Sequence, residues 1–553
     1  MPLHAIIMTR FRQIWNPGCY SSLTLWQEVQ DTFSYYSALS AQDAKESHAK
    51  WFPYNKGGEY RKWYGNTEYV VNWKDDGTEI KENTRRVYPQ LGNNLSWKIT
   101  SEDKYFTKGI AWSRISSTNF GVRICGTNLI FDTAAPMFFP NNEYEEWLDY
   151  IAAFMCSKIA GEILRILNPT LTFQVGDVGN LPVILESKCK NNIDILSQEC
   201  FKIAKCEWNS FETSWDFKRH PLLSVIPHHA ALFDDIDNID LAECYACWEN
   251  ECTERFNQLK TNEEELNRIF IDIYGLQDEL TPEVEDKDVT VRKADLQRDI
   301  KSLISYAVGC MFGRYSLNEE GLIYAGGEWD DSRYATFKPY KGNIIPITDE
   351  EYLDDDIVSR FCTWLKTAFG AKSLETNLDF IAKALGNKGN TSRKVIRNYF
   401  LSDFFKDHCQ TYSVTGSGKR PIYWLFDSGK QNGFKALIYL HRYNQDTIGS
   451  LRVDYLHKLQ RIYESEINRM QDMIDHTSNA REAAESAKRK EKLAKQLKEC
   501  REYDEKIGHL AMSRIELDLD DGVKVNYRKI QTAYDGKFYE VLADSKNIMV
   551  KEK

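Results

Sequence analysis

The spacing of hydrophobic residues changes along this chain, and that change constrains the fold more than any other feature of the sequence. Up to about residue 140, short aromatic or β-branched runs such as Tyr69-Val70-Val71 are separated by turn pairs such as Asp76-Gly77, a pattern typical of short strands. Beyond about residue 186, apolar residues recur at intervals of three and four, as they do on one face of a helix. At 553 residues the chain is also too long for a single hydrophobic core. We therefore expect an α+β multidomain protein, in which a mixed α/β domain is followed by predominantly helical domains and a long helix or helical hairpin.

The same pattern divides the chain into five segments. We expect a mixed α/β domain over residues 1–185, a helical spacer over 186–300, a mixed domain over 301–445, a long helix or helical hairpin over 446–512, and a C-terminal tail over 513–553. Within the spacer, the apolar spacing predicts helices over 189–214, 240–275 and 293–306.

Several individual elements follow from local patterns. Residues 22–39 and residues 142–166 each carry helical spacing, so a helix is predicted over both ranges. Residues 451–510 are strongly helical but interrupted, and Asn479, with a glutamate three residues later, is a suitable cap for a second helix. Residues 523–527 follow an Asp-Gly turn, and we expect them to form a strand.

Composition excludes some classes of protein. Lys and Arg number 71 against 82 Asp and Glu, a formal charge of −11, so the chain is not a generally basic protein that coats nucleic acid. No apolar run reaches the 18 or so residues of a membrane-spanning helix, and no membrane partner is expected. The 13 cysteines are odd in number and scattered, which fits reduced thiols better than a disulfide framework. We expect a cytoplasmic protein.

The clearest candidate binding segment is a cluster of basic and aromatic residues at 50–64, KWFPYNKGGEYRKWY. Cations can neutralise phosphates, aromatic rings offer faces on which bases stack, and glycine lets the backbone approach a groove closely. Residues 45–114 hold thirteen Lys and Arg against nine Asp and Glu, a local excess of positive charge in an acidic chain. The alternative is an aromatic core whose lysines are simply solvated.

Other site patterns fail on inspection. The Gly-Ser-Gly-Lys run within 413–420 lacks the first glycine and the final Ser or Thr of a phosphate-binding loop. Cys244, Cys247 and Cys252 resemble part of a zinc site, but they lie in a predicted helix with no second Cys-x-x-Cys, so buried thiols are the preferred interpretation. Asp177, Glu186 and Lys188 have the spacing of a weak nuclease motif, which arises often by chance in a chain this charged.

Seven segments resemble a known family. KGGEYRKWYGNTEYVVNW (56–73), KYFTKGIAWSRISSTNFGVR (104–123) and NPTLTFQVGDVGNLPV (168–183) are similar to the target-recognition region of adenine-specific DNA methyltransferases. CEWNSFETSWDF (206–217), EEELNRIFIDIYGL (263–276), ISYAVGCMFGRYSL (304–317) and KRPIYWLFDSGKQNGFKALIYLHRY (419–443) are more specific. Together they resemble the C-terminal half of the PglX family, the methyltransferases of BREX phage-exclusion systems, over essentially the whole chain. Type IIG restriction–modification enzymes form the neighbouring alternative.

The resemblance implies a bacterial DNA-modification protein. The family transfers a methyl group from S-adenosylmethionine to the N6 amine of adenine within a short site, and the adenine must leave the duplex to react. An Asn/Asp-Pro-Pro-Tyr/Phe loop receives that base in the family. The fourteen prolines of this chain are never adjacent, so the loop is missing, and Asn16-Pro17 and Asn168-Pro169 are only partial look-alikes. No glycine-rich turn for a cofactor is visible either.

We therefore expect the chain to be the specificity half of such an enzyme, without catalytic, cofactor-binding or metal-binding residues. The cofactor S-adenosylmethionine is expected for the full-length family and not for this chain. One expected partner is double-stranded DNA. Residues 186–553 carry 53 basic against 63 acidic groups, an acidic balance that favours protein contacts there, so the other expected partner is a separate methyltransferase half or other phage-exclusion proteins. Two alternatives stay open: an interaction scaffold that never contacts DNA, and an autonomous methyltransferase with an unrecognised catalytic loop.

The predicted DNA-binding residues all lie in the first 185 positions. Basic residues are expected to contact phosphates or bases, three aromatic residues to shape the loops that face the groove, and two polar residues after 175 to contact bases or only close a turn, the interpretation that we favour. The set is Lys56, Gly57, Gly58, Arg61, Lys62, Trp63, Tyr64, Lys104, Lys108, Trp112, Arg114, Asp177 and Asn180.

Overall fold

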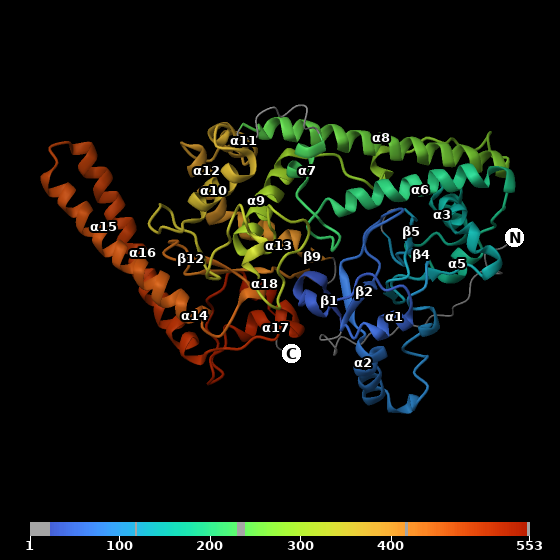
Figure 1. Cartoon of the computed structure of the whole chain (residues 1–553), viewed down its shortest axis with the longest axis horizontal. Coiled ribbons are helices and arrows are strands. Elements are labelled where there is room, and N and C mark those ends of the chain that lie inside the picture. Colours follow the sequence, from blue (N-terminus) through green and yellow to red (C-terminus); the bar gives the residue numbers. More distant parts are fainter. Residues whose placement is uncertain (1–22, 117–118, 229–237, 415–417, 550–553) are drawn as a thin grey trace. The chain divides into compact units, whose positions relative to one another are not determined.

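A computed structural model describes residues 23–116, 119–228, 238–414 and 418–549 (Figure 1). The chain divides into two compact units. The first comprises residues 1–29, 33–218 and 248–294, and the second comprises 30–32, 219–247 and 295–553. Both units combine helices with small sheets, which confirms the predicted α+β class. The five-segment division stays a prediction.

The first unit contains two small sheets. In the first sheet the strand order is β1-β3-β2-β6, and all pairs are antiparallel except β2 with β6. In the second sheet β4 lies between β5 and β7, antiparallel to both. The strands are β1 (Leu23–Leu25), β2 (Trp51–Asn55), β3 (Tyr69–Asn72), β4 (Gly109–Trp112), β5 (Val122–Cys125), β6 (Ile130–Phe131) and β7 (Met137–Phe138). The strand predicted around Tyr69-Val70-Val71 is confirmed.

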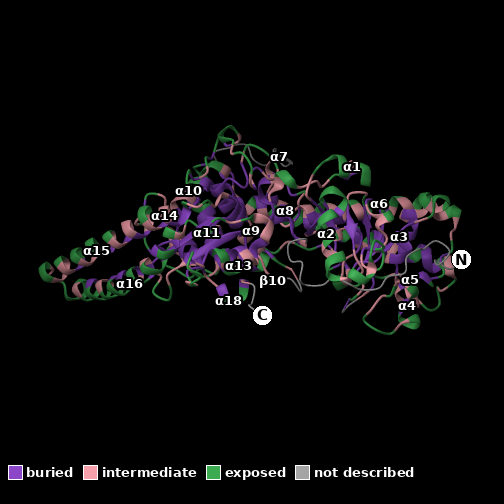
Figure 2. Cartoon of the chain, turned by 90° about the horizontal axis from the view of Figure 1, so that it is seen from below, coloured by how far each residue is buried: buried purple, intermediate pink, exposed green. Residues whose placement is uncertain are grey.

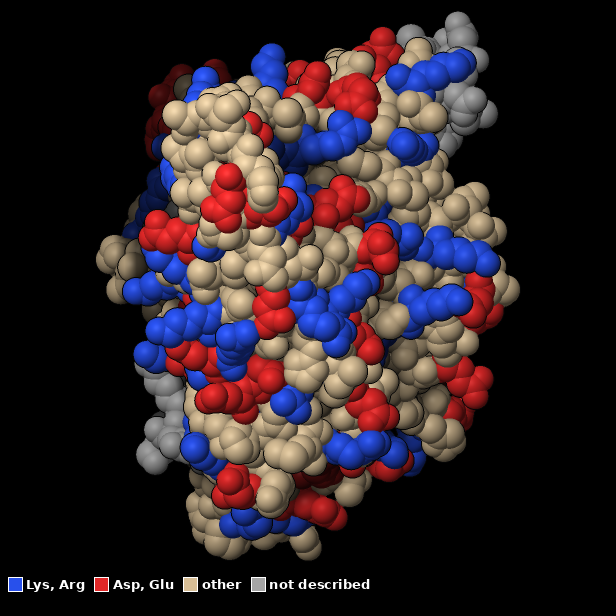
Figure 3. All heavy atoms as spheres, turned by 90° about the vertical axis from the view of Figure 1, so that its left-hand side faces the viewer, with Lys and Arg blue, Asp and Glu red and all other residues tan. Residues whose placement is uncertain are grey.

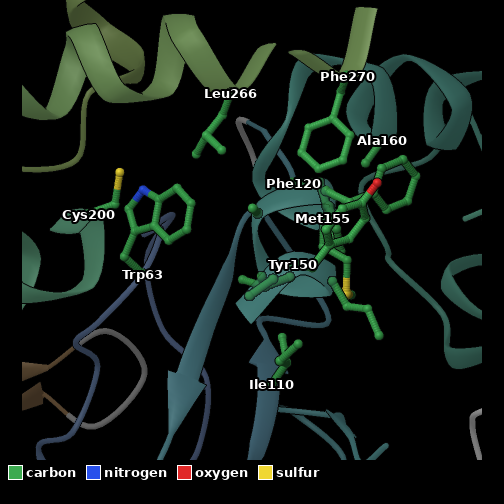
Figure 4. Close-up of a cluster of buried hydrophobic side chains, with 14 of the residues drawn as sticks. Trp63, Ile110, Phe120, Tyr150, Met155, Ala160, Cys200, Leu266 and Phe270 are labelled. Atoms are coloured by element: carbon green, nitrogen blue, oxygen red, sulfur yellow. The ribbon is translucent and has the colours of Figure 1, made fainter. Parts of the chain in front are cut away.

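Helices pack on both sheets of this unit. They are α1 (Ala41–Glu46), α2 (Lys74–Val87), α3 (Leu148–Cys156), α4 (Lys158–Leu167), α5 (Val175–Gly179), α6 (Ser187–Asn209) and most of α8 (Leu241–Tyr274). Helix α2 lies against β3 of the first sheet, and α3 lies against β4 and β5 of the second. Side chains of β4, β5, α3, α4, α6 and α8 form one buried cluster. Figure 4 shows its members converging from sheet and helices, with Trp63 beside Cys200, and Phe270 descending from α8.

Two predicted helices in this unit were wrong in extent or type. In the range 22–39, of which 23–39 is described, the structure has β1 and two 3-10 turns instead of an α-helix, because Leu23 to Leu25 pair with Tyr69 to Val71 in the sheet. The single helix predicted over 142–166 is a 3-10 turn followed by α3 and α4. The break is at Ser157, whose extended backbone ends α3 and whose hydroxyl caps the amide of Ala160.

The second unit is more helical. Its strands are β8 (Ile345–Pro346), β9 (Ser413–Val414), β10 (Gly418–Lys419), β11 (Tyr423–Asp427) and β12 (Lys435–Tyr439), with β12 between β11 and β8. Its helices are α7 (Pro221–His228), α9 (Leu296–Phe312), α10 (Ile357–Phe369), α11 (Leu374–Ala384), α12 (Ser392–Ser402), α13 (Phe404–Thr411), α14 (Thr447–Ser450), α15 (His457–His476), α16 (Ala480–Ser513), α17 (Gly522–Lys529) and α18 (Ser545–Ile548).

The predicted helical hairpin is confirmed. Helices α15 and α16 lie side by side (Figure 1), and the side chain of Asn479 accepts hydrogen bonds from the first amides of α16, as its capping role required. The base of the hairpin is fastened by Arg452, whose guanidinium pairs with Asp504 at 2.7 Å. The distal part is largely exposed (Figure 2). In the view of Figure 3, positive and negative side chains are interspersed over the described residues.

The strand predicted over 523–527 was wrong, because these residues lie in helix α17. Val523, Asn526 and Tyr527 are all buried, and their spacing of three and four places them on one helical face. The β-branched and aromatic composition of the run suggested a strand, but the buried face follows the helical period. In the part of the chain that the structure describes, every helix is too short or too polar to span a lipid bilayer.

Candidate nucleic-acid interface

The basic-aromatic cluster begins with a tight turn after strand β2. The side chain of Asn55 accepts a hydrogen bond from the amide of Gly57. Gly57 has a left-handed φ of 79°, and a Cβ there would lie 2.7 Å from the carbonyl oxygen of Ala134. Only glycine combines that φ with so close an approach. The amide of Arg114 bonds the same Ala134 oxygen at 3.0 Å, so the turn at 56–58 and the end of β4 meet there.

Further along, the cluster enters the interior as an extra strand-like segment. The amide of Trp63 donates to the carbonyl of Val122 at 2.7 Å, and the amide of Ile124 donates back to the carbonyl of Trp63 at 2.9 Å. Residue 63 therefore lies alongside β5, and its indole ring is 1% exposed within the main cluster (Figure 4). Trp63 is thus part of the core.

Arg61 forms an ion pair with Glu207 of α6. Its guanidinium also lies over the ring of Trp208, with 4.7 Å between Cζ and the ring centre, and Arg292 pairs with Glu207 from the other side at 2.6 Å. Burial disfavours the charge of the Glu207 carboxylate, but the two arginines outweigh it and hold the pKa of Glu207 below its usual range. Arg61 is therefore enclosed in an Arg–Glu–Arg arrangement.

Lys62 is likewise enclosed. Its ammonium pairs with Glu263 of α8, and the other oxygen of that carboxylate accepts a hydrogen bond from Nε1 of Trp63 at 2.7 Å. Lys62 is 4% exposed. Burial alone would lower the pKa of Lys62, but the Glu263 carboxylate outweighs burial and raises it. The amine is a charged internal anchor.

A buried arginine that the sequence did not single out lies under this segment. Arg123, on β5, is 2% exposed, and its nearest hydrogen bond runs from Nη1 to the hydroxyl of Ser113 at 3.4 Å. Burial lowers the pKa of Arg123 and raises the pKa of nearby Glu68 to about 7. The sequence did offer one sign of Arg123, because it is the single charged residue in a short apolar strand. That pattern does not show which side chain pairs with it.

The remaining predicted cations are at least partly accessible, but they form two groups. Lys108 is exposed and precedes β4, whereas Arg114 is half-buried and follows it, so about 20 Å of extended chain separates them. Lys104 is half-buried, close to Lys108 in sequence. Lys56 is half-buried, with its ammonium 4.6 Å from the ring centre of Tyr69. The structure thus brings the backbone next to Lys56 close to that of Arg114, through Ala134, whereas Lys104 and Lys108 are near each other in sequence.

Two of the predicted aromatic residues pack internally. Trp112 is fully buried, and its Nε1 donates to the carbonyl of Phe173 at 3.0 Å. Tyr64 is half-buried with its ring edge-on to Phe201, 5.4 Å between centres. Gly58 is exposed. A DNA-facing role for these residues stays a prediction.

Asp177 and Asn180 lie in and after the short helix α5. The Asp177 carboxylate accepts a hydrogen bond from the side chain of Asn168 at 2.6 Å, and the amide of Asn180 closes the helix onto Gly176 and Asp177. These bonds match the turn-closing interpretation. Contact with bases stays a prediction.

The described residues contain no cluster of three or more potential metal ligands. Cys244 and Cys252 are buried in α8, and the twelve cysteines of the described ranges are free thiols. Glu186, from the weak nuclease motif, caps helix α6 through the amide of Lys188. Part of the Gly-Ser-Gly-Lys run, Asn16-Pro17 and Cys19 lie outside the described residues.

Comparison with known proteins finds two similar methyltransferases. No protein-family model matches it. It is 44% identical over 510 residues to an adenine-specific methyltransferase PglX of Lacticaseibacillus casei, covering 92% of this chain and 41% of that protein. It is 35% identical over 554 residues to an adenine-specific methyltransferase BrxX of Escherichia coli, covering 95% of this chain and 42% of that protein. The chain spans about two fifths of the length of these relatives and, over nearly all of its own length, is homologous to the adenine-specific methyltransferases PglX and BrxX.

Proposed function

We propose that this chain supplies the DNA-binding specificity portion of an adenine-specific DNA methyltransferase that acts in BREX phage defence in the bacterial cytoplasm. The homology to PglX over 92% of the chain carries the proposal. Methyl transfer from S-adenosylmethionine is assigned to the rest of the full-length protein, because none of the residues here matches the Asn/Asp-Pro-Pro-Tyr/Phe loop of the family. Residues of this chain bind and orient the duplex.

The ion pairs divide the predicted contacts by role. Lys56, Lys104, Lys108 and Arg114 keep accessible cationic groups and contact DNA phosphates or bases. Arg61 and Lys62 form ion pairs with Glu207 and Glu263. They are therefore positioning residues that hold the 56–66 segment against α6 and α8.

The second unit and its hairpin contact protein partners in this proposal. Residues 186–553 carry more acidic than basic groups, and many surface cations of α15 and α16 are already paired, such as Arg501 with Glu464 at 2.6 Å. Such a surface repels the phosphate backbone but suits the methyltransferase half or other proteins of the defence system.

A salt titration of DNA binding tests the proposal. The full chain should bind duplex DNA, and Lys108→Gln should lower the slope of log K against log salt by about one unit if its phosphate contact is lost. Lys430→Gln is the matched control, because Lys430 is also exposed but belongs to the second unit. Absence of duplex binding would favour the scaffold alternative, and methyl transfer by the isolated chain would favour an autonomous enzyme.

A further inference from the structure

A hollow lies between helix α2 and the first sheet of the first unit. Its volume is about 90 Å³, whereas one enclosed water needs roughly 10–15 Å³. Strands β2, β3 and β6, helix α2 and the segment at 98–105 all contribute to its wall. It has room for a compact ring and not for a peptide segment.

Aromatic rings form much of this wall. Trp73 meets Tyr105 edge-on, with 5.2 Å between ring centres and an 80° angle, and Tyr105 meets Phe131 in the same way at 5.3 Å and 85°. All three residues line the hollow. Rings set at right angles to one another present a face and an edge to the space between them, which suits a flat aromatic guest.

Polar groups are placed at the same wall. The carboxylate of Asp132 lines the hollow and accepts a hydrogen bond from the amide of Ala134 at 2.7 Å. Burial raises the pKa of Asp132, and Lys56 opposes that rise. Lys98 also lines the hollow, its ammonium 4.0 Å from the ring centre of Tyr88. A flat guest would meet an acceptor at Asp132 and a cation at Lys98.

Unusual backbone surrounds the hollow. Asp75, Asp76 and Gly77 have left-handed φ values of 49°, 61° and 67° in succession, which L-residues adopt at a cost. A Cβ on Gly77 would lie 2.6 Å from the ring of Trp73. Ser101 and Phe106, which adjoin the lining residues Thr100 and Tyr105, are left-handed as well, with φ values of 53° and 59°. Strain of this kind persists where the surroundings enforce it and gathers at ligand sites.

We propose that this hollow binds one nucleobase-sized planar heteroaromatic ring that carries an amine, stacked on one of the perpendicular rings of Trp73 and Tyr105 and edge-on to the other, with its amine donating to Asp132. The lining residues differ from the DNA contacts proposed above, although Lys56 acts on Asp132 and Lys104 adjoins Tyr105. The site is also distinct from the loop that receives the reacting adenine in the family. The ring can come from two sources that share this chemistry: a free nucleoside, or a base displaced from a duplex.

The first arm of the test uses the full chain and free nucleosides. Guanosine, adenosine, cytidine and thymidine are titrated by ligand-observed NMR, and the amine-bearing nucleosides should bind at least about tenfold more tightly than thymidine, which lacks an exocyclic amine. Thr84→Trp places a large ring in the hollow from α2 and should abolish binding. Arg85→Trp is the matched control, because Arg85 is exposed on the same helix and does not line the hollow.

Asp132→Asn tests the polar end without adding bulk. This variant exchanges an acceptor for a group that also donates, so the preference for amine-bearing nucleosides over thymidine should shrink about tenfold or more. Retention of the full preference would contradict the assigned role of Asp132. Asp132→Asn also keeps the proposal testable if Thr84→Trp fails to fold.

The second arm uses DNA. A duplex with one unpaired guanine opposite an abasic site should bind about tenfold more tightly than the paired duplex, and Thr84→Trp should remove only that difference, if displaced bases are the source. Nucleoside binding without this difference identifies free nucleosides as the source. If nucleosides do not bind and the two duplexes bind equally, the proposal is overturned. Because binding to the paired duplex is scored separately, the site and the proposed DNA-binding function can fail independently.

Discussion

Replacing Glu263 by glutamine should remove the charge that keeps Lys62 stable in the interior. The glutamine oxygen can still accept the Trp63 hydrogen bond, so the change is confined to the ion pair. The ammonium of Lys62, 4% exposed, is left with no compensating carboxylate at this position. Removing one partner of a buried pair typically costs about 3–5 kcal/mol.

An independent estimate limits that cost. The buried lysine can avoid an unpaired charge by losing its proton. At pH 7 this deprotonation costs roughly 4.6 kcal/mol for a group whose usual pKa is about 10.4. A neutral lysine in the folded variant means that the unfolded chain binds more protons, so the stability of Glu263→Gln should rise with pH toward about 10. The wild-type protein should not show this rise from Lys62, because Glu263 keeps it protonated when folded.

Urea unfolding of the first unit measures these quantities. Glu265→Gln, on the same helix, breaks only an exposed pair with Arg268 and should cost under about 1 kcal/mol. Combining Glu263→Gln with Lys62→Met should recover most of the loss, with a coupling of at least about 2 kcal/mol. The double variant should also keep the salt dependence of DNA binding. Additive costs, or a flatter salt slope, would refute the positioning role of Lys62.

Three further predictions concern other parts of the chain. Asn479→Ala should cost about 1 kcal/mol of local stability at the start of α16, seen as faster amide exchange there; unchanged exchange would contradict the cap. Burial lowers the pKa of His408 to about 3, and its Nε2 accepts hydrogen bonds from the amides of Ile422 and Tyr423. The neutral His408 therefore contributes its full share of the unfolding free energy above pH 6.5, and that share is lost as pH falls toward 3. His408→Gln should make the unfolding free energy depend less steeply on pH in this range, by the equivalent of about one proton. Gly77→Ala should lower the melting temperature, because the Cβ would strike Trp73; an unchanged value would contradict the close packing.

Helix ends could be predicted from sequence for only some of the long periodic segments. The helices expected over 189–214 and 293–306 are α6 (Ser187–Asn209) and α9 (Leu296–Phe312), whose ends differ from the expected ones by up to six residues. The helix expected over 240–275 is α8 (Leu241–Tyr274), and the break capped by Asn479 lies where local chemistry placed it. Both depend on interactions within one or two helical turns, which the sequence displays directly. Short elements were less secure, as residues 523–527 show, because their type was decided by tertiary packing.

The candidate site was harder to predict because its decisive contacts are distant in sequence. Lys62 and Glu263 are 201 positions apart, and Arg61 and Glu207 are 146 apart. A basic-aromatic run has the same composition whether its cations face a phosphate backbone or buried glutamates. Here Trp63 joins the interior, as the aromatic-core alternative required, but Lys62 is buried as well and not solvated. DNA contact by the partly accessible Lys56 stays a prediction.

The burial of these charges sets an upper limit on the electrostatic part of DNA binding by the predicted residues. Four accessible cations remain, Lys56, Lys104, Lys108 and Arg114. Each phosphate contact contributes about −0.9 to the slope of log K against log salt on duplex DNA, so this set yields a slope no steeper than about −3.6. A steeper measured slope would require cations from other parts of the protein. A slope near this limit would mean that the buried pairs hold the loop in place while four side chains provide the contact.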